Sequence, residues 1–297
     1  MMRTVCLLLA CLLVFLCLPS ACAEEAAPPR EYAFQKKILY TYDTETLRFQ
    51  VERFVYGGTD CYLTKVWMAD PGRQIRKVTA DWGKNIKQPA VLAKQVPESP
   101  LVINGSGYVS PRYPWIPEEY PGTNADYYYT PLGSLTVTDG TVFRDLTGIP
   151  YSGLTLESDG LHMYVNAENE EVLAAGPTQT WSFYDQCPVL LRNEDILPDE
   201  WNFADRRANR TVIARTDRNN YLILSVNNKT GKGLSLRAVS TFFRENFDTE
   251  WVYDLDGGPS SALLVRGQGK KIRRAVIGGT AKVADIMAFT EADGQSE

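Results

Sequence analysis

The segment Asp254-Leu255-Asp256-Gly257-Gly258-Pro259-Ser260-Ser261 is the most informative part of this chain. It follows Trp251-Val252-Tyr253, an apolar run typical of a buried strand. Asp254 and Asp256 are two residues apart, so they share a face if the strand continues through them. The two glycines permit a tight turn, and two hydroxyl side chains follow it. A strand that ends in carboxylates, flexible backbone and hydroxyls predicts the floor of an active site.

The remainder of the chain reads mostly as short strands with a few helices. Residues 211–216 and 221–226 form a predicted hairpin, and residues 89–95 a short helix. The clearest helix spans 234–247, with apolar side chains at helical spacing and Ser235 as its N-cap. There is no internal repeat and no dividing linker. The sequence therefore predicts one domain of the α+β (mixed) class, with mixed β-sheets and covering helices.

The N-terminus has the pattern of an export signal. Arg3 precedes an unbroken apolar run over residues 5–18, which is too short for a comfortable membrane span. The small residues around Cys22 predict cleavage before Glu24; lipid attachment at Cys22 is the less favoured alternative, because Pro19 stands where an aliphatic residue is usual. We expect a signal peptide at 1–23, a tether or lead-in at 24–44, the domain at 45–292 and a tail at 293–297. No later segment could span a bilayer.

The net charge limits the kinds of binding partner to be expected, and the cysteine content bears on the redox state of the compartment. The full chain carries a net charge of −5, and removal of Arg3 with the signal makes the mature chain one unit more negative. Without a basic run, nucleic acid is not an expected partner. The mature chain keeps two cysteines, Cys61 and Cys187, which either pair in an oxidising compartment or remain two buried thiols.

Residues 109–131 form a predicted long loop rich in proline, tyrosine and tryptophan. Its rings either stack on a sugar or pack the loop onto the domain. Asn104, Asn209 and Asn228 each begin an Asn-x-Ser/Thr triplet, which we interpret as chance matches.

Four segments occur in an order that resembles the phosphodiester glycosidase family. They are Val102-Ile103-Asn104-Gly105, Cys187-Pro188-Val189-Leu190-Leu191-Arg192-Asn193, Arg210-Thr211-Val212-Ile213-Ala214 and the segment from Asp254 to Ser261. The resemblance covers residues 45–292 and implies hydrolysis of a sugar-1-phosphodiester, with N-acetylglucosamine α-1-phosphate as the best-known sugar. The chain departs from the family pattern at Ser106, Ala214 and Pro259, which affects the expected sugar more than the expected fold.

Glycosyl phosphate hydrolysis needs a carboxylate near the anomeric carbon and an electrostatic grip on the phosphate. We expect Asp256 to act as nucleophile or base, although a structural aspartate capping the turn is the alternative. Asp254 would tune Asp256 or handle a proton, Arg210 would grip the phosphate, and Asn104 would bind a sugar hydroxyl or acetamide. The backbone N–H groups of the two glycines could also face an anion. The expected substrate-binding residues are Gly105, Thr211, Gly257, Gly258, Ser260 and Ser261.

No cofactor is required by the sequence, and a divalent cation near the acidic residues is left open. The single histidine, His162, makes a Ser-His-Asp triad or a histidine-based zinc site a poor expectation. Arg215 is expected on a strand surface. Two rival functions remain, which are a glycan-binding module without catalysis and a phosphodiesterase that breaks the P–O bond.

Overall fold

The computed structural model describes residues 34–82, 84–110, 128–183, 187–227, 231–270 and 273–292. The predicted signal peptide, the C-terminal tail, Asn228 and most of the aromatic loop lie outside these residues. Among the described residues, the strands form two large sheets and two small ones, all paired antiparallel. The described residues are mostly sheet with few helices, which fits the predicted mixed sheets, whereas the balance of sheet and helix lies further toward sheet than the α+β label implies.

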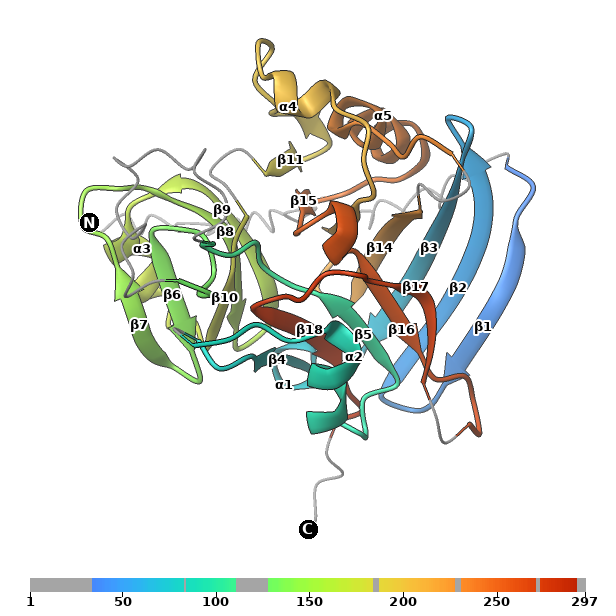
Figure 1. Cartoon of the computed structure of the whole chain (residues 1–297), viewed down its shortest axis with the longest axis horizontal. Coiled ribbons are helices and arrows are strands. Elements are labelled where there is room, and N and C mark those ends of the chain that lie inside the picture. Colours follow the sequence, from blue (N-terminus) through green and yellow to red (C-terminus); the bar gives the residue numbers. More distant parts are fainter. Residues whose placement is uncertain are drawn as a thin grey trace, which may run out of the picture.

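The larger sheet, called sheet A, curves along one side of the molecule (Figure 1). Its strands, in spatial order, are β1 (Lys37–Asp43), β2 (Leu47–Tyr56), β3 (Thr59–Met68), β14 (Asn220–Asn227), β13 (Thr211–Arg215), β15 (Trp251–Asp254), β11 (Pro188–Leu191) and β12 (Glu194–Asp195). Strand β1 falls within the segment 24–44 that we expected to be a lead-in, so that part is sheet and not tether. The predicted hairpin is confirmed as β13 and β14.

Sheet B packs across sheet A and contains five strands. In spatial order they are β17 (Arg274–Gly278), β16 (Ala262–Val265), β5 (Leu101–Asn104), β18 (Asp285–Phe289) and β4 (Ile75–Thr79). A lobe beside sheet B holds the small sheets (Figure 1). One is β10 (Gln179–Trp181), β8 (Tyr151–Glu157) and β9 (Gly160–Ala167), and the other is β6 (Leu135–Thr138) and β7 (Thr141–Asp145).

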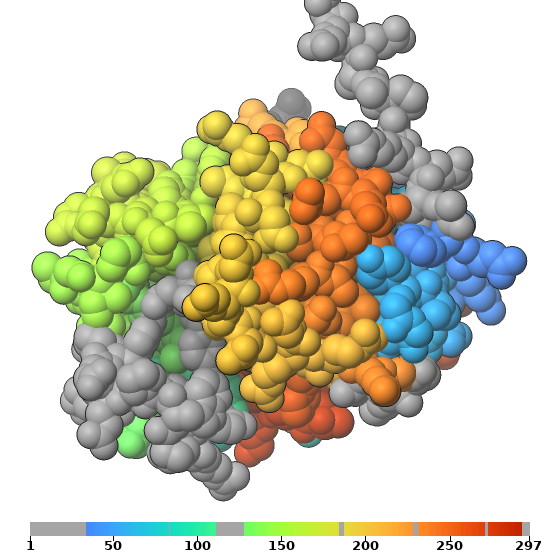
Figure 2. All heavy atoms as spheres, turned by 90° about the horizontal axis from the view of Figure 1, so that it is seen from above, coloured from blue at the N-terminus to red at the C-terminus, as the bar shows by residue number. Residues whose placement is uncertain are grey.

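The helices are short and lie on the outer faces of the sheets. They are α1 (Pro71–Gln74), α2 (Pro89–Leu92) with its 3-10 extension η1 (Ala93–Gln95), α3 (Asn169–Ala174), α4 (Asn202–Asp205), α5 (Leu236–Asn246) and the 3-10 turn η4 (Gly258–Ser260). Helix α5 confirms the predicted helix, and the Ser235 hydroxyl accepts a hydrogen bond from the N–H of Ala238 at 3.2 Å. The segment that includes α4 and α5 covers the middle of the face seen in Figure 2.

Alternating side chains divide the interior into layers. Along β13, Ile213 faces the core between the two sheets, whereas Val212 and Ala214 face the core beneath α5. A third cluster fills the space between sheet B and α2. The site described below therefore lies where the ends of β5, β13 and β15 meet, between two well-packed cores.

Cys61 and Cys187 are both buried, and no disulfide joins them. Cys61 lies in the core beneath α5, and Cys187 lies in the core between the sheets. Burial raises the pKa of the Cys61 thiol to about 12. Of the two alternatives left open by the sequence, the structure has the buried thiols.

None of the helices in the part of the chain that the structure describes has the length and apolar character of a membrane-spanning helix.

Candidate active site

The four segments that carry the family resemblance meet at one place. The Asn104 side chain, at the end of β5, joins them: its Oδ1 accepts from the Thr211 hydroxyl at 2.8 Å and from the N–H of Ala262 at 2.9 Å. Its Nδ2 donates to the carbonyl oxygen of Asp256 at 2.6 Å. The N–H of Asp254 donates to the carbonyl of Cys187 at 3.0 Å, which brings in the remaining segment.

Asn104 is fully buried, and both lone pairs of its amide oxygen are already occupied. We had expected Asn104 to bind a sugar, but its amide oxygen is already occupied within the protein. The structure gives it a positioning role instead, because it fixes the loop of Asp256 against Thr211. The Thr211 hydroxyl is also committed to this contact, so it is not available to a substrate either.

Gly105 is required by close packing. Its carbonyl accepts the N–H of Asp256 at 3.1 Å, and a Cβ at this position would collide with Oδ1 of Asp285. The residue therefore allows the loop of Asp256 and the buried Asp285 carboxylate to approach the same backbone. Its observed role is packing rather than contact with a substrate.

Arg210 forms a buried ion pair with Asp254. Its Nη1 lies 2.9 Å from Oδ2 of Asp254, and the two side chains are 2% and 0% exposed. Nε donates to the carbonyl of Leu234 at 3.2 Å and Nη2 to the carbonyl of Arg206 at 2.8 Å. Because all three guanidinium nitrogens are engaged inside the protein and the side chain is buried, Arg210 in this conformation is the partner of Asp254, and its expected role at a phosphate stays a prediction.

Asp254 does not lie beside Asp256 in the way the sequence suggested. Strand β15 ends at Asp254, so the alternation that would place both carboxylates on one face stops there. Burial raises the pKa of Asp254 to about 6, and the Arg210 charge opposes that rise. Among the described residues, Oδ1 of Asp254 is buried without a hydrogen-bond partner. Asp254 balances the charge of Arg210, and it reaches Asp256 only through the electrostatic field.

Asp256 is the residue of the group that is not fully buried as a whole, although its carboxylate is desolvated. Desolvation raises its pKa to about 7, and the negative charges of Asp254 and Asp285 act in the same direction. Hydrogen bonds from the Ser260 side chain and the N–H of Gly257 oppose the rise. A carboxyl group that titrates near neutral pH and is not paired with a cation is suited to nucleophilic or acid–base work.

The glycine pair shapes the loop but does not form an anion cradle. The N–H of Gly257 donates to the Asp256 carboxylate, and the N–H of Gly258 donates to the carbonyl of Asn209 at 3.0 Å. Gly258 has a φ of +59°, and a Cβ on Gly257 would come within 2.8 Å of the Asn209 carbonyl oxygen. Both glycines are therefore needed for backbone geometry, and the expectation that their N–H groups face an anion is wrong.

The two serines of the segment differ. Ser260 orients the Asp256 carboxylate through its hydrogen bond. The Ser261 hydroxyl is buried and, among the described residues, has no hydrogen-bond partner.

Sequence reasoning missed a buried ion pair beneath this site. Lys77 of β4 and Asp285 of β18 lie 3.4 Å apart with fully buried side chains. Oδ1 of Asp285 accepts the N–H of Ser106 at 2.7 Å, which holds the loop that follows Asn104. Burial lowers the pKa of Lys77 and raises that of Asp285. The available signal was Asp285 itself, a charged residue inside an otherwise apolar strand.

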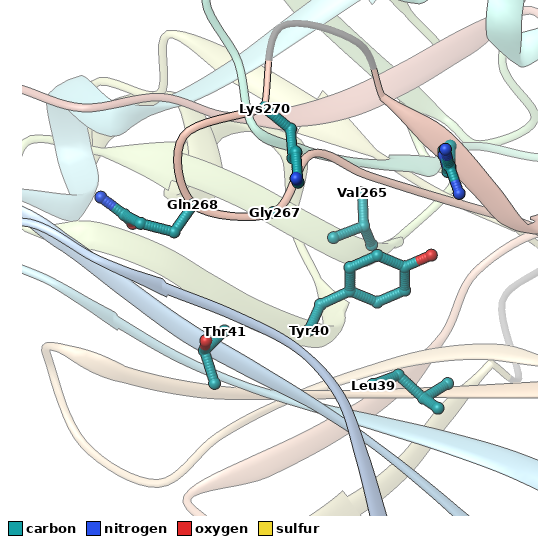
Figure 3. A pocket seen from close by; sticks show the side chains of 8 residues that line it. Leu39, Tyr40, Thr41, Val265, Gly267, Gln268 and Lys270 are labelled. Carbon is teal, nitrogen blue, oxygen red and sulfur yellow. The ribbon is translucent and has the colours of Figure 1, made fainter.

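Two cavities lie outside this cluster. The larger, about 600 Å³, opens between β1 and the β16–β17 hairpin, where Lys270 and Tyr40 extend toward the same space (Figure 3). None of the expected site residues lines it. The smaller, about 270 Å³, is lined by Lys84, Asn85, Ile86, Tyr108, Ser110, Tyr129 and Lys282. Its lining residue Lys282 lies two residues after Thr280, whose N–H donates to the carbonyl of Pro259 at 2.8 Å, but no residue from 254–261 lines the cavity.

The chain matches the family model for phosphodiester glycosidases over residues 99–290, more than half of its length. It belongs to the phosphodiester glycosidase family. This membership points to a glycosidase-type hydrolase that acts on a sugar phosphodiester. A search of the curated proteins found no match.

Two solved structures share the fold. The catalytic domain of zebrafish N-acetylglucosamine-1-phosphodiester alpha-N-acetylglucosaminidase, auto-inhibited by its pro-peptide, superposes with a TM-score of 0.61 at 15% identity, over 87% of this chain and 88% of that one. A hypothetical protein from Synechocystis gives 0.52 at 14% identity, over 89% of this chain and 64% of that one. At these identities the likeness concerns the fold.

Proposed function

We propose that this chain is an exported hydrolase that cleaves the glycosidic C–O bond of a sugar-1-phosphodiester, with Asp256 as the reacting carboxylate. Water supplies OH to the anomeric carbon, the C–O bond electrons pass to the phosphate oxygen, and the remaining proton of the water passes through Asp256 to the phosphomonoester, which leaves as its monoanion or, after giving that proton to solvent, as its dianion. A phosphodiester of N-acetylglucosamine is the substrate class that the family and the fold favour.

The observation that carries this proposal is the contrast between Asp256 and its acidic neighbours. Asp254 and Asp285 are buried against Arg210 and Lys77, so neither can reach a substrate. Asp256 is partly exposed and titrates near neutral pH, and Ser260 holds its carboxylate in place. A carboxylate is what an oxocarbenium-like transition state requires.

Because Arg210 is engaged with Asp254, the phosphate needs another cation. We assign this role to Lys84 and Lys282, which line the cavity of about 270 Å³; Lys282 follows the segment that bonds to Pro259 through the N–H groups of Thr280 and Ala281. A hydrogen bond to a charged group contributes about 1.5–3 kcal/mol, so loss of one lysine should lower kcat/KM about tenfold or more. Lys282→Met tests this assignment, with Lys37→Met on edge strand β1 as the control.

The deciding experiment compares wild type, Asp256→Asn and the exposed-site control Asp43→Asn on the methyl phosphodiester of N-acetylglucosamine, with release of free sugar as the readout. The proposal requires release by wild type and by the control, and its loss in a folded Asp256→Asn protein. Full activity of Asp256→Asn would remove Asp256 from the mechanism. If wild type binds the diester without turnover, the chain is a glycan-binding module.

Isotope labelling separates the two bonds that a hydrolase could break. In ¹⁸O-labelled water, C–O cleavage places the label in the released sugar. Label in the phosphate would mean P–O cleavage and a phosphodiesterase.

Export is also part of the proposal, and it depends on the signal pattern at 1–23. The mass of the protein recovered from the producing cell should correspond to a chain that begins at Glu24. A lipid-modified Cys22 would support the anchored alternative.

A further inference from the structure

The hairpin of β8 and β9 brings the only histidine of the chain together with two carboxylates. One ligand atom from each of Glu157, Asp159 and His162 lies within 4.8 Å of the others. Nε2 of His162 is 2.7 Å from Oδ1 of Asp159 and 3.8 Å from Oε2 of Glu157. In the part of the chain that the structure describes, this is where three metal-ligating side chains converge, and Asp254, Asp256 and Asp285 do not form such a group.

The cluster lies at the opposite end of sheet A from Asp256. Nη1 of Arg215 donates to the carbonyl of Leu161 at 2.8 Å, and the Tyr221 hydroxyl accepts the N–H of Leu161 at 3.2 Å. Arg215 is the last residue of β13, whereas Thr211, at the first position of the same strand, contacts Asn104. The hairpin is thus anchored to the sheet at a place that the Asp256 site does not touch.

The Glu157 carboxylate is already oriented by two donors outside the cluster. The Thr155 hydroxyl donates to its Oε1 at 2.7 Å, and the Tyr164 hydroxyl donates to the same atom at 3.0 Å. Oε2 is therefore the atom that faces His162, and its side chain is only 13% exposed. Ligands of metal ions are commonly held by such outer hydrogen bonds.

The three side chains share one face of the hairpin for a simple reason. Thr155 pairs directly with His162, and Glu157 pairs with Gly160 across the two-residue turn that contains Asp159. Residues two apart on a strand lie on the same side, so Thr155 and Glu157 face the same way as His162 and Tyr164. The spacing Glu157-x-Asp159-x-x-His162 is thereby converted into a convergent set of one nitrogen and two oxygens.

We propose that Glu157, Asp159 and His162 bind a divalent transition-metal ion of the zinc class, with water completing the coordination. Imidazole nitrogen with carboxylate oxygen suits Zn²⁺, whereas Ca²⁺ and Mg²⁺ prefer oxygen ligands alone. The metal takes the place of the hydrogen bond between His162 and Asp159, and the neutral imidazole then carries its proton on Nδ1 while Nε2 binds the ion. Two carboxylates and a neutral imidazole balance the ion, and the nearby Arg215 charge is matched by Glu250 at 2.8 Å.

Such a site would be structural, because it connects the turn of the hairpin to β9 at a distance from the carboxylate proposed to react. Metal binding to the folded state stabilises it by RT ln(1 + c/Kd), where c is the free metal concentration, so the melting temperature should rise with the logarithm of that concentration. The inference is independent of the proposed hydrolysis, since it concerns residues that the reaction does not use.

The test uses the mature chain without a histidine tag, stripped with chelator and titrated with ZnCl₂ by calorimetry and with CoCl₂ by visible absorption. We expect one ion per chain and a d–d spectrum typical of nitrogen and oxygen ligands. Tyr164→Phe, which loosens Glu157, should weaken binding about tenfold. His162→Gln should weaken it further, and Glu171→Gln on α3 should leave it unchanged.

Absence of stoichiometric binding by the wild type, or equal affinity in the His162→Gln protein, would overturn the proposal. If His162→Gln does not fold, Asp159→Asn gives the same decision. Binding that survives both His162→Gln and Asp159→Asn would place the metal elsewhere and equally contradict the proposal.

Discussion

Strand β13 carries an arginine at each end, and the two ends use it differently. Arg210, directly before the strand, pairs with Asp254 where both side chains are at most 2% exposed. Arg215, at its last position, pairs with Glu250, whose side chain is 49% exposed. The first pair places the Asp254 charge where it helps to raise the pKa of Asp256, whereas the second arginine anchors the β8–β9 hairpin through Leu161. One strand thus carries a buried ion pair at one end and a partly solvated ion pair at the other.

The largest expected difference between the two ends comes from removing each acid. Asp254→Ala leaves Arg210 as a buried charge without its counter-ion and should cost about 3–5 kcal/mol of unfolding free energy. Glu250→Ala exposes Arg215 to water that already reaches the pair and should cost about 1 kcal/mol or less. Urea denaturation at pH 7.5 measures both. Equal losses would show that the two pairs are energetically alike.

The pH dependence of stability should have opposite signs at the two ends. Burial raises the pKa of Asp256 from its ordinary value of 3.8 to about 7, so between these values the folded state binds more protons and stability falls as pH rises. Asp256→Asn should remove the part of this slope near pH 7, while the raised pKa of Asp254, about 6, keeps a slope of the same sign at lower pH. The hydrogen bond from His162 lowers the pKa of Asp159, so that carboxylate stabilises the fold above its unfolded pKa, and the gain is lost as pH falls through the folded value.

Asp159→Asn should accordingly reduce stability at neutral pH and flatten the acid side of the profile. Melting temperatures from pH 3 to pH 8 for wild type and both variants check these signs. A wild-type slope near pH 7 that persists in Asp256→Asn would mean that another group titrates near neutral pH.

Alanine substitution of a glycine should cost more stability at the β8–β9 end, at Gly160, than at the Asp256 end, at Gly258. A Cβ on Gly160, at φ +130°, would lie 2.5 Å from the Tyr221 hydroxyl, and this overpacking should cost about 2–3 kcal/mol. Gly258, at φ +59°, has open space around it, so Gly258→Ala should cost only the backbone penalty of about 1 kcal/mol. Thermal unfolding of both variants gives the ranking. A larger loss at Gly258 would contradict it.

The smallest contrast concerns two threonines. The Thr211 hydroxyl donates to Asn104, so Thr211→Val should cost about 1 kcal/mol. The buried Thr249 hydroxyl has no hydrogen-bond partner within the described ranges, and Thr249→Val should be neutral to within about 0.5 kcal/mol. Chemical denaturation resolves a difference of this size. A clear loss for Thr249→Val would indicate a partner such as bound water.

The sequence predicted those features that depend on local pattern. Helix α5, the β13–β14 hairpin and the short helix at 89–95 follow from periodicity and capping. The convergence of the four segments also follows, because glycines and hydroxyls after buried strands indicate where loops gather. The order of the four segments along the chain, which resembles that of the family, supported each assignment more than the residues of that segment did alone.

The site details that failed all depend on pairing between distant strands. Val212 of β13 pairs with Asp254 of β15, and this register places Arg210 and Asp254 on the α5 side of sheet A. No local pattern states that register. Arg215 was expected on the surface, yet it is 7% exposed because the β8–β9 hairpin covers it. The partnership of Lys77 and Asp285 likewise requires knowing that β4 and β18 are neighbours.

Asn104 has a consequence for how this molecule loses its shape. Its amide links the two sheets by hydrogen bonds. Asn104 belongs to β5 of sheet B, and its side chain bonds to Thr211 of sheet A and to the loop of Asp256. Separation of the sheets breaks the hydrogen bonds of Asn104, and release of the loop of Asp256 exposes the same buried amide. The loop of Asp256 and the contact between sheets A and B should therefore open as one cooperative unit. Slow hydrogen exchange at residues 103–105 and at 254–256 should then share a single opening event.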